Sequence, residues 1–293
     1  MLGSAFRANA RCCEVAQTTD PACDRVRAVT TRGESTFADP DQPDCPDAPG
    51  PMPGGTSRRH QRLTALVEVT LCSGYPTQLL LIAVLAVMGL TAIDESGTLS
   101  LSYIFLLSMT DTVLLLCLIF YFLRQHREHP AEIFFGNRPH RPELRLGLVL
   151  TPVVIVLALG GVSLLQYLWP ALRNVPENPF ASLLSSPWRV AVFAVVAVVA
   201  GGVREELQRA FVLRRFECHL GGSAVGLVVF SLAFGLGHAI QGWDAAVVTG
   251  LLGAVWGVVY LVRRSVVSTI VSHSGFNMIE ICLAFAGVST GAS

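Results

Sequence analysis

The sequence VREELQRAF, residues 203–211, decides how the rest of this chain is interpreted. It follows the apolar run AVFAVVAVVAGG (191–202), which has the composition of a membrane helix. A charged side chain at the centre of a bilayer costs about 2.5–3.5 kcal/mol or more, so such residues are rare unless they are paired or functional. Two glutamates and two arginines after this run therefore mark either the water interface or a functional site. The remaining sequence has to distinguish between the two.

The composition is that of a membrane protein. Of the 293 residues, 52% are hydrophobic and only 14% are charged, and the mean hydropathy is +0.54. A soluble domain typically carries about 25% charged residues. The net charge is zero, which argues against nucleic acid as a partner. We therefore expect an all-α fold, a polytopic helix bundle in a lipid bilayer.

The N-terminal segment differs from the rest. Residues 1–62 are rich in Pro, Gly, Asp, Thr and Arg and lack apolar periodicity, most clearly in ADPDQPDCPDAPGPMPGG (38–55). Such a composition cannot bury enough surface to offset its chain entropy. We expect residues 1–62 to be disordered and residues 63–293 to form the helix bundle.

Long apolar runs alternate with short polar ones from residue 63 onward, and a run of about 20 apolar residues is long enough to cross a bilayer. The pattern predicts seven spans: near 76–94, near 99–123, 146–169, from 188 onward, 223–240, 244–262 and 265–286.

The loops between these runs alternate between arginine-rich and arginine-poor. The segments before the first span and after the second, fourth and sixth are rich in arginine, whereas those after the first, third and fifth hold at most one. Because cytoplasmic loops carry the excess of basic residues, we expect a multi-pass protein of the cell membrane with a cytoplasmic N-terminus. The stretch 203–211 then lies toward the cytoplasmic end of the fourth span.

Several polar residues occur within or at the ends of the predicted spans, at helical spacing. His273 and Asn277 are four residues apart, so they project from one face of a helix, and Glu280 continues that face. His238 follows Phe234 at the same spacing on another span. The remaining polar residues are Asp111, Glu205, Glu206 and Arg209. Helix bundles build sites from side chains on facing helices, so these faces are expected to converge.

These residue types together can hydrolyse a peptide bond. A carboxylate in a poorly solvated site can take a proton from water. A histidine and an asparagine can donate hydrogen bonds to a developing oxyanion. Glu205, His238 and His273 are also suitable zinc ligands, although the sequence HExxH of many metalloproteases is absent.

Each residue also has a purely structural interpretation. The charges of 203–211 can pair along the wet end of a helix, and His238 can be a packed, hydrogen-bonded histidine. Asp111, which stands between Thr110 and Thr112, is best explained by a hydrogen bond to another helix. The joint occurrence of the other residues, in order and near span ends, is what favours a functional site.

Three motifs in residues 187–280 resemble the CAAX prenyl protease and bacteriocin-processing (CPBP) family of intramembrane endopeptidases. That family carries EExxxR, FxxxH and HxxxN on successive helices, and the chain has REELQR (204–209), FGLGH (234–238) and HSGFN (273–277). The protease-like core is expected over about residues 187–286.

The first motif departs from the family pattern, in which the arginine lies five residues after the first glutamate. Here Arg209 lies four residues after Glu205. If the glutamates are aligned, the arginine is displaced by one position; if Arg209 is aligned, Arg204 replaces the first glutamate. Glu205 belongs to the pair in either register, so it is the first candidate for the base and Glu206 the second. Arg209 is expected to orient Glu205 across one helical turn.

The resemblance implies an all-helical membrane endopeptidase in which Glu205 and His238 activate water while His273 and Asn277 stabilise the oxyanion. Its partners would be the bilayer and peptide or protein substrates in or at the membrane. The cofactor stays open between a divalent metal such as zinc, held by His238, His273 and Glu205, and none. The alternative is a non-catalytic immunity or scaffold protein that keeps the fold. An ion carrier is disfavoured because the chain shows no inverted repeat.

Overall fold

The structure is a computed structural model, and it describes residues 55–94, 97–136, 138–176 and 178–290. Most of the segment expected to be disordered lies outside these residues. Helix α3 begins at Gly55, however, so residues 55–62 are helical in the structure.

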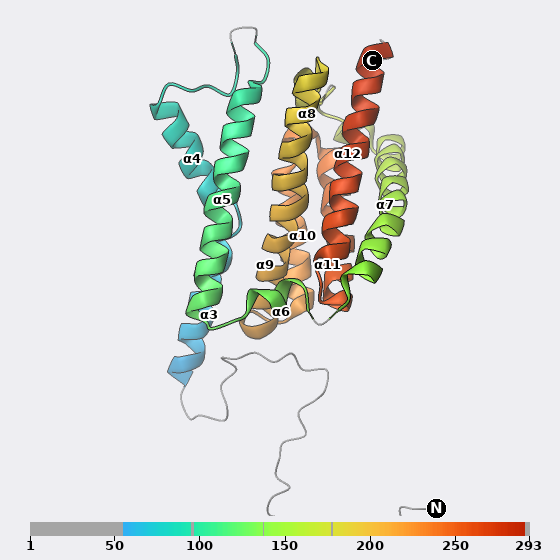
Figure 1. Cartoon of the computed structure of the whole chain (residues 1–293). Helices are drawn as coiled ribbons and strands as arrows, with labels where there is room; N and C mark the ends of the chain where they lie inside the picture. The colour runs from blue at the N-terminus through green and yellow to red at the C-terminus, as the bar shows by residue number, and fades with distance from the viewer. Residues whose placement is uncertain (1–54, 95–96, 137, 177, 291–293) are drawn as a thin grey trace, which may run out of the picture. The chain divides into compact units, whose positions relative to one another are not determined.

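The described residues are almost entirely helical, with one isolated β-bridge between Ile93 and Leu99. Figure 1 shows the arrangement of the helices. The α-helices are α3 (Gly55–Leu71), α4 (Tyr75–Val87), α5 (Leu101–Gln125), α6 (Pro130–Phe134), α7 (His140–Leu168), α8 (Pro187–Val196), α9 (Glu205–His219), α10 (Ser223–Gly237), α11 (Trp243–Arg263) and α12 (Val267–Thr290). A π-helical segment, η3 (Ala197–Arg204), joins α8 to α9, and short 3₁₀ turns are η1 (Pro170–Leu172), η2 (Pro179–Leu184) and η4 (Ala239–Gln241).

Four of the described helices are long and apolar enough to cross a membrane: α5, α7, α11 and α12. A fifth candidate is the pair α3 and α4, which is bent by 44° at a short break. These helices indicate a multi-pass membrane protein. The expectation of seven spans exceeds this number for two reasons. The expected fifth span is α10, a helix of only 15 residues, and the expected fourth is divided among α8, η3 and α9.

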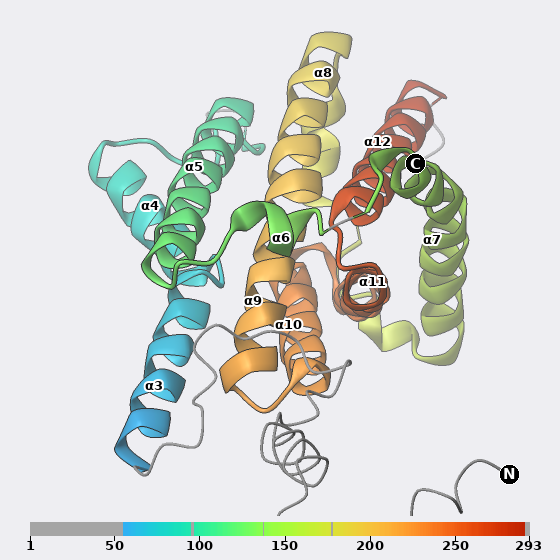
Figure 2. The same cartoon turned by 60° about the horizontal axis from the view of Figure 1, so that its bottom comes forward.

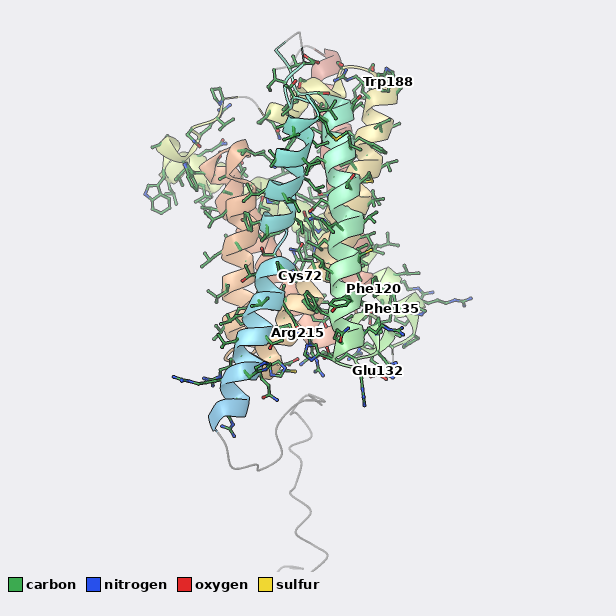
Figure 3. The ribbon with its side chains drawn as sticks, turned by 90° about the vertical axis from the view of Figure 1, so that its left-hand side faces the viewer. Cys72, Phe120, Glu132, Phe135, Trp188 and Arg215 are labelled. Atoms are coloured by element: carbon green, nitrogen blue, oxygen red, sulfur yellow. The ribbon has the colours of Figure 1, made fainter. Side chains whose placement is uncertain are left out.

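The glutamate pair lies in the middle of a long helical segment. The 10-residue α8 and the 8-residue η3 precede Glu205, and the 15-residue α9 begins with it. α8 and α9 follow one line in Figure 1, and Figure 3 places Trp188 and Arg215 at opposite ends of the bundle. The sequence analysis expected the pair toward the end of a span. The helix continues instead, because α9 is packed within the protein, where its charges find partners.

α12 packs closely against η3 because η3 contains two glycines. A Cβ atom on Gly202 would overlap the side chain of Ser274, and one on Gly201 would lie 2.6 Å from the Asn277 amide nitrogen. A π-helical segment of this kind, with hydrogen bonds from i to i+5, often occurs at a functional site. The two glycines therefore bring the motif on α12 against the segment that directly precedes the glutamate pair.

The other helices of the C-terminal half lie around this contact. In Figure 2, α11 is seen nearly end-on, with α7, α10 and α12 around it. One apolar core joins α7, α11 and α12 through Val154, Trp256 and Phe276. A second joins α5, α9 and α10 through residues such as Leu115, Phe211 and Phe230.

Buried ion pairs attach the N-terminal helices to α9. Arg215 on α9 lies 2.6 Å from Glu68 on α3 and 2.5 Å from Glu128, which follows α5. His126 approaches Glu68 at 2.6 Å. Removing one member of such a pair leaves the other charge buried and unpaired, so the contacts fix α3 and α5 beside α9.

We expect Gly202→Ala to destabilise the protein by about 1–3 kcal/mol, because the added methyl group overlaps Ser274 and a packed interior tolerates little extra volume. The measurement is thermal unfolding of the purified protein in detergent. Gly160→Ala is the matched control, since a Cβ at Gly160 in α7 meets no atom within 4 Å. Equal unfolding temperatures for the two variants would contradict the close contact between η3 and α12.

Candidate active site

Glu206 is a buried carboxylate with two partners. Its side chain is fully enclosed, and its Oε1 accepts a hydrogen bond from Nη1 of Arg209. The same oxygen lies 2.9 Å from Nδ1 of His273 on α12. Since an ionised carboxylate has no proton to donate, Nδ1 of His273 is the donor in that contact. Glu206 therefore links α9 to α12 and fixes the orientation of the His273 ring.

Arg209 is committed to this buried cluster. Its Nε and Nη2 atoms have no hydrogen-bond partner, and its guanidinium group faces aromatic rings instead. The three rings lie 5.0–5.7 Å from the guanidinium carbon and belong to Phe230, Phe234 and Trp256. Cation–π contacts of this kind are stronger when the cation is shielded from water. The sequence spacing predicted that Arg209 orients Glu205, but the structure pairs Arg209 with Glu206, three residues away.

His273 lies between two aromatic side chains. Its ring stacks on Trp256, with 3.9 Å between ring centroids and 17° between the planes, and Phe234 meets it edge-on. Trp256 itself donates a hydrogen bond from Nε1 to Ser272. With Nδ1 held by Glu206, the other nitrogen, Nε2, lies 3.8 Å from Oε2 of Glu205.

Glu205 is more accessible than its neighbour. Its side chain is 14% exposed, and its Oε1 lies 3.0 Å from Nη2 of Arg204. It lines a cavity of about 400 Å³ that His238 also lines. The structure thus separates the two glutamates: Glu206 is enclosed by its partners, whereas Glu205 faces an open space.

His238 caps the C-terminal end of α10. Its Nδ1 lies 2.9 Å from the carbonyl oxygen of Phe234, one turn earlier, and so donates to it. Nε2 is then the nitrogen with a free lone pair. α10 is short enough to end at this level of the bundle, which explains how His238 reaches the same cavity as Glu205.

A second cavity, of about 290 Å³, adjoins the first. His238, Phe180 and Gln241 line both cavities. The second is mostly apolar, and its other polar lining residues are Asn178, Thr249, His273, Asn277 and Glu280. The structure therefore gathers Glu205, His238, His273 and Asn277 around two adjoining cavities and keeps Glu206 behind them.

Asn277 uses one amide hydrogen for structure. Its Nδ2 donates to the carbonyl oxygen of Ala197, at the start of η3, over 3.0 Å. The amide still has a second hydrogen, and the residue lines the smaller cavity next to His273. The i and i+4 spacing therefore places both side chains on the face of α12 that the sequence predicts.

Asp111 forms the interhelical hydrogen bond expected for it. Thr77 of α4 donates to its Oδ1 over 2.5 Å, and Nη1 of Arg204 lies 2.8 Å from its Oδ2. Arg204, in turn, bridges Asp111 and Glu205. Asp111 is thus connected to the site through one side chain.

Trp256 and Phe180 were not predicted as site residues. Nothing in an apolar run distinguishes a tryptophan that stacks on a histidine from one that fills the core. The break between α3 and α4 lies at SGYP (73–76), where the first span was expected to begin and where Gly and Pro combine in the manner of a turn. Gly74 there has a φ of 87°, and Ser73, Gly74 and Tyr75 line the larger cavity.

The residues do not fit a metal ion. Among the described residues, no group of three or more His, Cys, Asp and Glu side chains is arranged to hold one. Nδ1 of His238, Nδ1 of His273 and Oε1 of Glu205 have other partners, which leaves Nε2 of each histidine and Oε2 of Glu205 as the atoms that could face an ion. In this conformation Glu205, His238 and His273, the set considered as zinc ligands, are not arranged as a coordination site.

The comparisons with known proteins agree with the motifs. The comparison with curated proteins found no match, and neither did the comparison with solved structures. Residues 186–279, which contain all three motifs and η3, match the family described as type II CAAX prenyl endopeptidase Rce1-like. This segment of the chain is therefore similar to the Rce1-like type II CAAX prenyl endopeptidase domain, a domain of the CPBP family.

Proposed function

We propose that this protein is an intramembrane endopeptidase that hydrolyses peptide bonds of membrane-associated substrates. Glu205 and His238 activate a water molecule, and His273 and Asn277 stabilise the oxyanion. The observation that carries the proposal is the pair of cavities meeting at His238, with Glu205 on one side and His273 and Asn277 on the other. The family match of residues 186–279 supports the same activity.

In this mechanism the carboxylate of Glu205 takes a proton from water while the water oxygen attacks the scissile carbonyl carbon. Nε2 of His238 accepts the second hydrogen bond of that water and orients it. The tetrahedral intermediate then expels the amine, and Glu205 returns the proton to the leaving nitrogen. A base positioned in this way contributes about 10²- to 10⁴-fold to the rate.

His273 and Asn277 supply the donors for the oxyanion. Because Nδ1 of His273 is taken up by Glu206, Nε2 is the ring nitrogen left to donate to the oxyanion in this proposal. The second amide hydrogen of Asn277 is the other donor. Each donor held toward the developing charge is worth about 10²- to 10³-fold.

The proposal places the chain in the cell membrane, with seven crossings and the N-terminus in the cytoplasm. α10 and the line formed by α8, η3 and α9 supply the two crossings beyond the five candidates. The arginine-rich loops support this orientation. Glu132 and Arg215, which Figure 3 shows at one end of the bundle, then lie on the cytoplasmic side.

We expect Glu205→Gln to lower kcat by about 10²- to 10⁴-fold with little change in unfolding temperature, because Glu205 lies at a cavity wall. Glu206→Gln should instead lower the unfolding temperature, on the order of 10 °C, because it leaves Arg209 buried without its counter-charge. The measurement is cleavage of internally quenched peptides ending in a CAAX sequence, with and without a farnesyl group, alongside thermal unfolding.

The matched control is Glu132→Gln, which changes an exposed glutamate on α6. If Glu205→Gln cleaves as fast as the Glu132→Gln control, Glu205 is not the base. If the unmodified protein cleaves neither peptide, the alternative of a non-catalytic immunity or scaffold protein is favoured.

His238→Ala should lower kcat by about 10²- to 10⁴-fold, because the water loses the group that orients it. His129→Ala is the matched control, since His129 is exposed outside the cavities. Full activity in the His238→Ala variant would remove this residue from the mechanism.

Cleavage should continue after dialysis against EDTA, with a rate within about twofold of the untreated protein, because the side chains do not form a zinc-binding set. Metal analysis of the same sample should find zinc well below one ion per chain. Stoichiometric zinc, together with loss of activity that added zinc restores, would contradict this prediction.

A further inference from the structure

We propose that Arg204, held in place by Asp111, is the residue that positions Glu205. The inference rests on the proposed function, since it concerns the group that acts as the base there. It assigns to Arg204 the orienting role that sequence spacing suggested for Arg209. Asp111 then acts on the site through Arg204, without touching the water or the substrate itself.

The guanidinium group of Arg204 has no freedom to turn, because each of its three nitrogens has an acceptor. Nε donates to the carbonyl oxygen of Ala200 over 3.1 Å, Nη1 to Oδ2 of Asp111 over 2.8 Å, and Nη2 to Oε1 of Glu205 over 3.0 Å. A planar guanidinium held at all three nitrogens fixes the position of each acceptor. Oε1 of Glu205 is thereby held, and Oε2 is left facing His273.

Asp111 is equally constrained. Its side chain is almost fully buried, and Thr77 donates to the oxygen that Arg204 does not use. Gln78 of the same helix approaches the other oxygen at 3.5 Å. The hydroxyl group and the guanidinium divide the two oxygens between them, so α4 and α5 together determine where Arg204 is held.

The charge of Asp111 also determines how strongly Arg204 interacts with Glu205. Arg204 is buried, and Asp111 and Glu205 are its two carboxylate partners. Without Asp111, its positive charge would be balanced by Glu205 alone. The base would then be drawn away from the cavity wall toward the arginine. Sharing the cation between two carboxylates leaves Glu205 at the wall.

Arg209 is not available for this role. Its guanidinium group is held by the contact with Glu206 and by the three aromatic rings around it, and Arg209 does not line the larger cavity. Arg204 does line the cavity. Each glutamate therefore has its own arginine.

The inference extends the catalytic apparatus beyond the segment that matches the family. Asp111 and Thr77 lie on α5 and α4, outside residues 186–279. The helices that precede the family domain thus hold its base in position.

The test compares kcat, KM and unfolding temperature in two buried aspartate variants, Asp111→Asn and Asp244→Asn. Asp244 is a matched control, because it is also buried and joins two helices through Gln166, but it does not line either cavity. We expect Asp111→Asn to lower kcat about 10- to 100-fold with KM nearly unchanged, as a misplaced catalytic group does. Asp244→Asn should lower the unfolding temperature and leave kcat within about twofold of the unmodified protein, since Asp244 bonds to neither Arg204 nor Glu205 and lines neither cavity.

A charge-swapped double variant, D111R/R204D, separates positioning from stability. It restores an ion pair between α5 and η3 but places a carboxylate, not a guanidinium, beside Glu205. Positioning by Arg204 predicts recovery of the unfolding temperature without recovery of kcat. Recovery of both would show a purely structural role and overturn the inference. Arg204→Lys should also lower kcat, because one ammonium group cannot hold both carboxylates.

If the double variant does not fold, the two aspartate variants decide the matter at a temperature well below both unfolding transitions. Equal kcat values for Asp111→Asn and Asp244→Asn overturn the inference while leaving the proposed function intact. An unmodified protein that cleaves no peptide overturns both. If the unmodified protein is active and Glu205→Gln inactivates it, a lower kcat for Asp111→Asn than for Asp244→Asn supports the role of Arg204.

Discussion

The contact between Arg209, Glu206 and His273 is the interaction on which the rest of the site depends. A charge inside a membrane bundle must have a partner, because burying it unpaired costs far more than any single packing contact returns. Glu206 balances Arg209 and also accepts from His273, so one carboxylate joins α9 to α12. Trp256 then stacks on His273 and joins α11 to the same point. Because Glu206 is used in this way, the adjacent Glu205 is left to face the cavity.

Hydropathy and run length predicted much of the fold. The spans expected near 99–123 and at 146–169, 244–262 and 265–286 correspond to α5, α7, α11 and α12. The division of the fourth expected span was not predictable, because one apolar run continues from α8 into η3 and does not show where the hydrogen-bond pattern changes. The continuation of α9 past the glutamates was not predictable either. A charged run in the sequence predicts the end of a span. Only the structure shows that the charges have buried partners, such as Glu68 and Glu128 for Arg215.

The candidate site was predictable as a set of residues but not as a set of contacts. Helical spacing placed His273 and Asn277 on one face, and both line the smaller cavity. Spacing could not separate Glu205 from Glu206, since neighbouring residues on a helix point about 100° apart and only tertiary packing decides which one faces inward. The sequence also predicted only part of what Asp111 contacts. A hydrogen bond to another helix was predictable, but the connection of Asp111 to Glu205 through Arg204 was not.

The spacing between Glu206 and Arg209 and the position of Asp111 have a common explanation. An arginine three residues after Glu206 lies on the same helix face, one turn away, and pairs with it directly. That spacing leaves Glu205 without a cation from its own helix turn, and Arg204 supplies one from the π-helical segment. The buried guanidinium of Arg204 also has a second carboxylate partner, which α5 provides through Asp111, so its charge is not balanced by Glu205 alone. A helix outside residues 186–279 therefore supplies one of the two carboxylates that balance the arginine beside Glu205.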